Sequence, residues 1–491
     1  MKIKKYYVVW NGSLKLVMLN FPHLVTNNKK INTAYRLAVA TLAANILPFK
    51  DGLLKKEEPV IIAGLGCYVT PWTRDAAINV WNACGLICSD EALNTLKSVL
   101  KKTDAGYVIG GEYWDCIIWT AGAWWQYLYT GDKEFLKLAY NAVENSLAFF
   151  EETEFSQELN LFRGPACYGD GVAAYPDIYA QNGESGIITF ASENKELCED
   201  KGFGIPIYAL STNCLYYYAY ILADKMACEL EKPQKYSFRA ENMKKAINSV
   251  FWNKEKQTYN YIYDKFGGCD SAEGMGLSFA LLFDIADEEK KQAVIKNAPS
   301  TPYGFPCVYP SFSRYNTPDG MGFGRHSGTV WPHIQGFWAD AMALNGEIER
   351  FDKEFIIQTD NALRYYQFAE IYHPLTGEIY GGRQERSKKG ISEWDSEPYQ
   401  TWSATAYLRN VYMNLVGMRF ETDGIRFMPV GSSLTESVTL KSVRYRDSVL
   451  NIHISGKGNT VKKFFINGEI QMKPFVPSNQ KGNVNIDIEM G

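Results

Sequence analysis

The chain has 491 residues, 46% of them hydrophobic and 22% charged, which predicts a folded protein with one large and one small domain, or with two or three ordinary domains. The net charge of −4 and the lack of any basic block exclude nucleic acid as the main partner, because phosphate binding needs clustered Lys and Arg. The sequence has neither an apolar run of about 18 residues nor a clean cleavage site near its start, so we expect no membrane helix and a cytoplasmic location.

Helical periodicity dominates from about residue 30 to residue 418. Apolar residues recur at i, i+3 and i+4, which predicts helices over 32–47, 90–102, 116–132, 134–152, 211–231, 237–253, 276–285, 329–346, 354–370 and 401–417. Several of these segments are apolar nearly all round, as expected where two layers of helices pack on each other. About a dozen helices joined by loops rich in Gly, Pro and aromatic residues predict an (α/α)6 barrel, a toroid of six helical hairpins, with a pocket at one end.

The pattern changes at Gly417. Four segments after it alternate apolar and polar residues with period two, so residues 419–491 predict a small antiparallel, sandwich-like β domain. The sequences "RDS" and "NGE" are typical of its hairpin turns. Residues 1–29 are expected to be an N-terminal extension with one or two strands, and residues 30–418 the helical barrel.

Four loop segments of the predicted barrel combine carboxylates with aromatic residues and glycines. They are YVTPWTRDAAINVWNA (68–83), GGEYWDCIIWTAGAWWQYLYTGD (110–132), FRGPACYGDGVAAYPD (162–177) and YGGRQERSKKGISEWDSEPYQTWSATAYL (380–408). The chain lacks metal-ligand spacing, a phosphate-binding loop and a nucleophile elbow, so we expect no metal and no cofactor. Sugar rings stack on Trp and Tyr, and glycoside hydrolysis needs two carboxyl groups. The combination favours a glycoside hydrolase.

Each of these acids also has a purely structural interpretation. Asp75, next to Arg74 and close to Trp72, either favours the helix dipole or accepts two sugar hydroxyls. Asp115, which follows Trp114, is either a helix cap or a site residue. Asp170 sits between two glycines, where a turn also favours Asp, and Asp177 competes with it for the catalytic role. The fourth segment leaves three acids open: Glu385, Glu393 and Glu397.

In this order, the segments resemble the six-hairpin glycosidases, above all the amylo-α-1,6-glucosidase domain of glycogen-debranching enzymes and the processing α-glucosidases. "WTRDAAINVWNACGLI" is similar to an element at the start of a helix in those families, and "IIWTAGAWWQYLYTGD" to the helix that follows a sugar-binding Asp. "CYGDGVAAYP" resembles their acid loop, "STNCLYYYAYIL" the next helix, and "RHSGTVWPHIQGF" their "GTVWP" element. The resemblance covers about residues 65–415.

The resemblance implies an exo-acting inverting hydrolase of a terminal sugar, with an α-glucoside as the first choice of substrate. Asp170 would be the general acid, kept protonated by burial. In those families the catalytic Glu precedes an "AWSVA"- or "SWSAA"-like helix by about 17 residues, and Glu385 lies 17 residues before Trp402, so Glu385 would be the general base. Trp331 is expected at the pocket rim, outside the core. The implied substrate-binding set is Trp72, Arg74, Asp75, Trp114, Asp115, Tyr168, Asn213, Arg325, His326, Trp331, Glu397 and Trp402.

Other functions fit the same residues. A glycoside phosphorylase on the same barrel would bind phosphate through Arg325, His326 and Arg383. An α-L-rhamnosidase or α-mannosidase stays open, because one fold hosts several specificities. A sugar-binding barrel without activity is the remaining hypothesis, and the sequence does not determine the oligomeric state.

Overall fold

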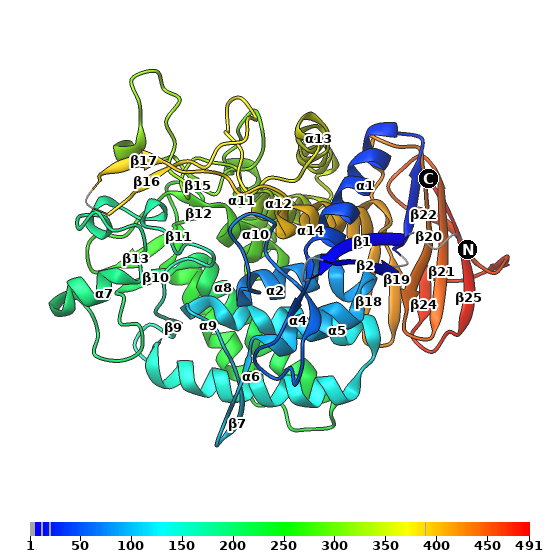
Figure 1. The fold of residues 1–491 in the computed structure, drawn as a ribbon, viewed down its shortest axis with the longest axis horizontal. Helices are drawn as coiled ribbons and strands as arrows, with labels where there is room; N and C mark the ends of the chain where they lie inside the picture. Colours follow the sequence, from blue (N-terminus) through cyan, green and yellow to red (C-terminus); the bar gives the residue numbers. More distant parts are fainter. Residues whose placement is uncertain (1–4, 11–12, 19–20, 388) are drawn as a thin grey trace.

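The computed structural model of the protein describes residues 5–10, 13–18, 21–387 and 389–491, with side chains from residue 21 onward. It contains a large helical part and a smaller β part at one side, beside which the first strands of the chain also lie (Figure 1). Residues 1–4, 11–12 and 19–20 of the predicted N-terminal extension lie outside the described residues. None of the helices in the described ranges has an apolar run long enough to span a bilayer.

An inner ring of six helices is the centre of the described helical part. The helices are α2 (Thr73–Asn79), α5 (Trp119–Thr130), α8 (Leu210–Glu229), α10 (Gly274–Leu282), α12 (Pro332–Leu344) and α14 (Thr401–Arg409). Each helix packs on the next in this order, and α14 packs back on α2, so the ring closes. Nearly every residue of α10, α12 and α14 is buried, because other helices surround them.

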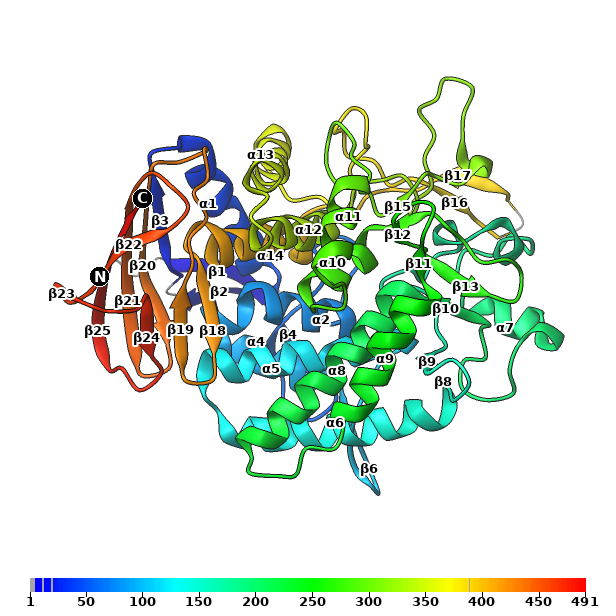
Figure 2. The same cartoon turned by 180° about the vertical axis from the view of Figure 1, so that it is seen from behind.

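A second set of helices covers the outside of this ring (Figures 1 and 2). It comprises α1 (Lys29–Ala44), α4 (Ser89–Ser98), α6 (Lys133–Thr153), α9 (Ser237–Val250), α11 (Glu288–Asn297) and α13 (Ile348–Tyr365). These helices bury only one face, as in α13, where Phe351, Phe355 and Ala362 recur at helical spacing. The two layers follow directly from the two kinds of helical pattern in the sequence.

Most of the predicted helices are confirmed, with two differences. The helix expected over 90–102 ends at Ser98, because Leu100–Thr103 (β6) turns back and pairs with Gly106–Ile109 (β7). The sequence pattern did not predict α11, since only Val294 and Ile295 of this highly charged helix are buried.

Short two-stranded pairs join the helices: β4 (Ile46–Phe49) with β5 (Glu58–Ile61), β8 (Phe155–Ser156) with β9 (Leu161–Phe162), β10 (Ile207–Ala209) with β13 (Ile262–Asp264), β11 (Trp252–Asn253) with β12 (Thr258–Tyr259), β14 (Ala272–Glu273) with β15 (Val308–Tyr309), and β16 (Arg383–Glu385) with β17 (Ile391–Glu393).

The C-terminal part contains a six-stranded and a three-stranded sheet. The larger sheet has the order β23 (Glu469–Ile470), β22 (Val461–Ile466), β25 (Gly482–Met490), β21 (Ser448–Gly456), β20 (Ser437–Tyr445) and β3 (His23–Thr26). The smaller one has the order β18 (Met418–Glu421), β19 (Gly424–Phe427) and β24 (Phe475–Pro477). Inward residues of both sheets, such as Phe427 and Phe464, share one core.

The expectation of an antiparallel β domain is wrong for one pair of strands. β25 runs parallel to β21 and antiparallel to β22, because the chain crosses through β22, β23 and β24 before it returns beside β21. The larger sheet also takes β3 from the N-terminal region, which the sequence pattern could not assign to it. The "RDS" and "NGE" turns join β20 to β21 and β22 to β23 as predicted. A separate hairpin, β1 (Lys5–Trp10) and β2 (Ser13–Met18), precedes β3.

Candidate active site

A cavity of about 290 Å3 opens where the N-terminal ends of several inner helices meet. Trp72 directly precedes α2, Trp331 directly precedes α12, and Trp402 lies in the first turn of α14. The cavity is lined by Tyr68, Trp72, Arg74, Asp75, Tyr113, Tyr168, Asp170, Gly171, Ser185, Gly186, Arg325, His326, Trp331, Glu370, Gln384, Trp394 and Trp402. It therefore combines aromatic walls with three carboxylates and two arginines, as a sugar site requires.

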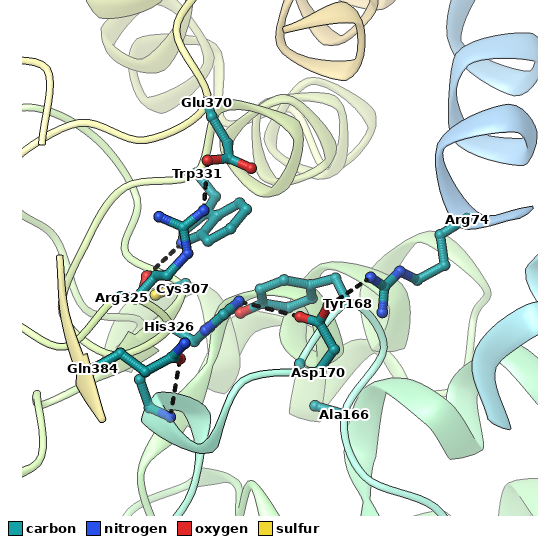
Figure 3. Close-up of polar contacts among 12 residues, drawn as sticks. Arg74, Ala166, Tyr168, Asp170, Cys307, Arg325, His326, Trp331, Glu370 and Gln384 are labelled. Carbon is teal, nitrogen blue, oxygen red and sulfur yellow. Dashed lines mark hydrogen bonds and ion pairs between the residues drawn. The ribbon is translucent and has the colours of Figure 1, made fainter. Parts of the chain in front are cut away.

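Asp170 lies between the side chains of Arg74 and His326 (Figure 3). Its Oδ2 is 3.4 Å from Nη2 of Arg74, and its Oδ1 is 3.6 Å from Nε2 of His326. Burial raises the pKa of Asp170, but the positive charges of Arg74 and Arg325 hold it below its ordinary value. The expectation that burial keeps Asp170 protonated is therefore wrong for this arrangement of side chains, because the neighbouring positive charges outweigh the cost of burial.

Arg74 also holds the buried Asp115, which does not line the cavity. Nη1 of Arg74 is 3.3 Å from Oδ2 of Asp115, and this oxygen accepts the backbone N–H of Tyr168 at 2.8 Å. Tyr168 has a φ of 64°, a left-handed conformation that non-glycine residues rarely adopt. Asp115 thus supports the acid loop from behind, and it acts on the cavity through Arg74 and Tyr168.

Asp75 faces the cavity without a complete set of partners. It is 5% exposed, and its Oδ1 is buried and accepts no hydrogen bond from any residue that the structure describes. Burial raises the pKa of Asp75 to about 7, although Arg74 lowers it. An unpaired carboxylate oxygen at a sugar-sized cavity is suited to accept hydroxyl groups from a ligand.

His326 and Trp331 form one wall. Their rings stack with centroids 4.9 Å apart, and Nε1–H of Trp331 donates to the carbonyl of Arg325 at 2.8 Å. Burial lowers the pKa of His326 to about 3, so its imidazole is neutral. Pro332 occupies the first turn of α12, as predicted from its missing N–H. Trp331 itself is only 3% exposed and belongs to the hydrophobic core as well as to the cavity wall, so the expectation of a rim position outside the core is wrong.

Glu370 is the third carboxylate that lines the cavity, beside Asp75 and Asp170. Its Oε2 is 2.7 Å from Nη2 of Arg325, and its Oε1 accepts the hydroxyl of Tyr68 at 2.9 Å (Figure 3 shows the Arg325 pair). Glu370 is 1% exposed in a loop after α13. Sequence reasoning missed it, although an acid between the apolar residues of "FAEIY" is an unusual feature that points to a special role.

Glu385, which the sequence predicted as the base, lies outside the cavity. It follows Gln384 on β16, and successive residues of a strand face opposite sides, so Gln384 lines the cavity and Glu385 points away. Oε1 of Glu385 pairs with Nε of Arg314 at 3.1 Å, and Oε2 accepts the hydroxyl of Tyr315 at 2.6 Å. The buried carboxylate of Glu385 thus stabilises the segment that carries Arg314 and Tyr315.

The other acids of the sequence analysis have different positions. Glu397 does not line the cavity, and its Oε2 accepts the backbone N–H of Cys67 at 3.2 Å. Asp177 is exposed and pairs with Arg314 at 2.7 Å. Glu393 is exposed at the end of β17.

Two further predicted site residues have structural contacts instead. Trp114 is fully buried in a second hydrophobic cluster, and Asn213 is fully buried with its amide bonded to the backbone of Phe162 and Ala209. The structure thus brings together Trp72, Arg74, Asp75, Tyr168, Asp170, Arg325, His326, Trp331 and Trp402, and leaves Trp114, Asp115, Asn213, Glu385 and Glu397 outside the lining. The lining residues that were not predicted include Tyr68, Tyr113, Glu370, Gln384 and Trp394.

The cation set that a phosphorylase would need is not assembled. Arg325 is engaged with Glu370, and Arg383 donates to the carbonyl of Tyr315 and does not line the cavity. His326, the third member, is uncharged. Within the described residues, no group of three or more His, Cys, Asp or Glu side chains is arranged to hold a metal ion.

The cavity combines the features of a sugar site, and several solved structures are similar to the chain in fold. A GH63 mannosylglycerate hydrolase from Thermus thermophilus in complex with glucose is 14% identical, with a TM-score of 0.57 over 77% of this chain and 100% of that one. A GH78 rhamnosidase from Bacillus sp. GL1 is 13% identical, with a TM-score of 0.56 over 97% of this chain and 45% of that one. A sialidase is 14% identical, with a TM-score of 0.62 over 87% of this chain and 37% of that one. The chain therefore spans less than half the length of the last two.

The family model of the mannosylglycerate hydrolase MGH1-like glycoside hydrolase domain matches residues 118–403. The chain belongs to this family and is a glycoside hydrolase with a fold of the six-hairpin glycosidase type. A search of curated protein sequences gave no match. The resemblance to six-hairpin glycosidases is confirmed, and the α-glucosidase subtype stays a prediction.

Proposed function

We propose that the protein is an exo-acting inverting glycosidase, with Asp170 as general acid and Glu370 as general base. The observation that carries this proposal is that both carboxylates line one cavity and each is paired with a different arginine, Arg74 or Arg325. Glu370 replaces Glu385 in the role of base, because Glu385 turns away from the cavity into a structural ion pair.

The size and position of the cavity support action on one terminal sugar. Its volume of about 290 Å3 is at the lower end for ligand sites, which suits a single sugar ring with a small leaving group. We interpret the closed inner ring with its outer helices as an (α/α)6 barrel spanning residues 30–418, with residues 419–491 as the β domain. In such an arrangement the helix ends that carry Arg74, Trp331 and Trp402 enclose the bound sugar.

The proposed reaction is a single displacement. Asp170 donates its proton to the glycosidic oxygen as the bond from that oxygen to the anomeric carbon breaks. Glu370 takes a proton from a water molecule, whose oxygen attacks the anomeric carbon from the opposite face. The product sugar carries inverted configuration, and the two carboxyl groups are expected to lie about 6.5–9.5 Å apart in the complex.

Substrate binding is expected to shift the proton balance of Asp170. A sugar that displaces water from Asp170 adds to the burial that raises its pKa, and its glycosidic oxygen accepts a hydrogen bond only from the protonated carboxyl group. Asp75, with its unpaired Oδ1, is the proposed acceptor for two hydroxyls, and Trp72 and Trp402 are the proposed stacking surfaces.

For the sugar itself, an α-glucoside is the choice from the sequence resemblance. The family description and the structural neighbour that holds glucose add the α-mannoside of a small acid such as glycerate as an alternative of the same size. The engagement of Arg325 with Glu370 and the neutral state of His326 favour water over phosphate as the attacking group.

The test uses a panel of α-glucosides, α-mannosides and α-L-rhamnosides with NMR detection of the first-formed anomer. The variant Glu370→Gln is expected to lose about 10²–10⁴-fold in kcat, whereas the matched variant Glu385→Gln keeps its activity and loses thermal stability. Retained configuration in the product, or a fully active Glu370→Gln, contradicts the mechanism. Release of a sugar phosphate with added phosphate identifies a phosphorylase instead.

A further inference from the structure

Tyr68 is an inward-facing residue in an exposed loop. The loop connects β5 to α2, and residues 65–67 and 69–70 within it are exposed, whereas the ring of Tyr68 is half-buried and lines the cavity. The hydroxyl of Tyr68 donates to Oε1 of Glu370 at 2.9 Å. Burial and the charges of Glu370 and Asp75 raise the pKa of Tyr68, so the phenol stays protonated and keeps the hydrogen that it donates to Glu370.

The three donors around Glu370 leave little freedom to its carboxylate. Oε2 receives Nη2 of Arg325 at 2.7 Å and the backbone N–H of Glu397 at 3.2 Å, while among the described residues Oε1 receives only the hydroxyl of Tyr68. A carboxylate oxygen has two lone-pair sites, so Oε1 keeps one for a water molecule. Tyr68 is therefore the contact that sets the direction in which the free lone pair points.

Glu397 holds the loop that carries Tyr68. Its Oε2 accepts the backbone N–H of Cys67 at 3.2 Å, directly beside Tyr68. A Cβ on Gly66 would meet the carboxylate of Glu397, so the close approach of loop and carboxylate requires glycine at this position. Glu397 thus contacts both Glu370 and the loop that carries Tyr68. Its backbone N–H donates to the carboxylate of Glu370, and its side chain accepts the N–H of Cys67.

We propose that Tyr68 is a positioning residue that orients Glu370 as the base, and that Glu397 clamps the loop so that Tyr68 stays in place. The proposal rests on the proposed role of Glu370. It assigns Glu397 a function different from the substrate contact expected from the sequence, and it makes the loop at 65–70 part of the catalytic machinery.

The first experiment is Tyr68→Phe, which keeps the ring and removes the donor. We expect kcat to fall about 10-fold with KM within about twofold, because a hydrogen bond to a charged group is lost in a ring of unchanged size. The separate effects on kcat and KM are the readout of a positioning role, because a residue that only contacts the sugar or forms the wall would change KM instead. The exposed Tyr366→Phe serves as the matched control and is expected to have no effect.

An unchanged kcat, or a rise in KM alone, overturns the positioning role and makes Tyr68 a simple binding or wall residue. If Glu370→Gln remains active, the proposed role of Glu370 as the base is contradicted, independently of the result for Tyr68→Phe. The two failures are therefore distinguishable.

The clamp is tested without any substrate through Cys67. Burial and the neighbouring charge of Glu397 raise the pKa of the Cys67 thiol, so Glu397→Gln should speed its alkylation by iodoacetamide several-fold at about pH 8. Peptide mass spectrometry measures this rate, with the exposed Cys228 as internal control. Gly66→Ala displaces the same carboxylate and should act in the same direction, with circular dichroism to verify folding. An equal Cys67 rate in wild type and Glu397→Gln overturns the clamp.

Discussion

Nη2 of Arg74 lies 3.4 Å from Oδ2 of Asp170, so the positive charge of Arg74 acts directly on the carboxyl group that we propose as the general acid. Burial acts to raise the pKa of Asp170, yet the neighbouring positive charges hold it below its ordinary value. A general acid must be protonated to act, so binding of the sugar has to change this balance. The consequence is measurable in pH profiles.

The profile of kcat/KM reports the free enzyme, and the profile of kcat reports the complex with substrate. We expect the basic limb of kcat/KM to begin in the acidic range, because the pKa of Asp170 is lowered and activity is lost as pH rises through it. The basic limb of kcat should lie at higher pH. Initial rates across about pH 3–9 on one glycoside measure both, and coincident limbs contradict a change in Asp170 upon binding.

Asp170→Asn tests the acid role through the leaving group. A glycoside with a poor leaving group needs the proton of Asp170, so its kcat is expected to fall about 10²–10⁴-fold in the variant. A glycosyl fluoride or dinitrophenyl glycoside leaves without a proton and should retain most of its rate. Equal losses on both substrates would assign Asp170 another role, such as sugar binding, and the exposed Asp177→Asn is the control.

Trp331→Ala should reduce both stability and activity. Trp331 is 3% exposed and stacks on His326, so its truncation opens a cavity that costs about 3–5 kcal/mol in the free energy of unfolding. Its indole also lines the sugar cavity, so KM should rise at a temperature where the variant is still folded. Thermal unfolding and kinetics separate the two effects, and Trp331→Phe, with a smaller loss of volume, should show a smaller loss of stability. An unchanged melting temperature would mean that Trp331 belongs only to the rim.

Glu273 makes stability depend on pH. It is fully buried before α10. One carboxylate oxygen accepts the N–H of Ser211 at 2.9 Å, and the other has no partner within the described part of the chain. Burial raises the pKa of Glu273 to about 8, above the ordinary value of about 4.3 that it regains on unfolding. The stability that this group contributes is complete below about pH 4 and is lost as pH rises towards 8.

Glu273→Gln removes this ionisation. The melting temperature of the variant relative to wild type is expected to increase between about pH 5 and pH 8, because only the wild type must keep a carboxyl group neutral there. Differential scanning calorimetry at several pH values measures the difference. A constant difference across this range would show that Glu273 does not titrate between the folded and unfolded states.

Local patterns in the sequence determined most of the elements and one side of the site. The 3.6-residue period predicts inner helices such as α5 and α8, and the position of Arg74, Asp75 and Trp331 at helix starts brings them to one end of the ring. These features depend only on neighbours within one or two turns. They can therefore be predicted from the local amino-acid sequence alone.

The tertiary structure alone decided which glutamate lines the cavity with Asp170. Spacing along the chain pointed to Glu385, but the alternation of β16 turns Gln384 inward and Glu385 towards Arg314. Glu370 reaches the cavity because its backbone N–H bonds the carbonyl of Glu397 and because the nearby Tyr372 pairs with Val330. Such contacts join segments far apart in the chain, and no local period encodes them. The face that a single side chain presents is therefore fixed by long-range pairing.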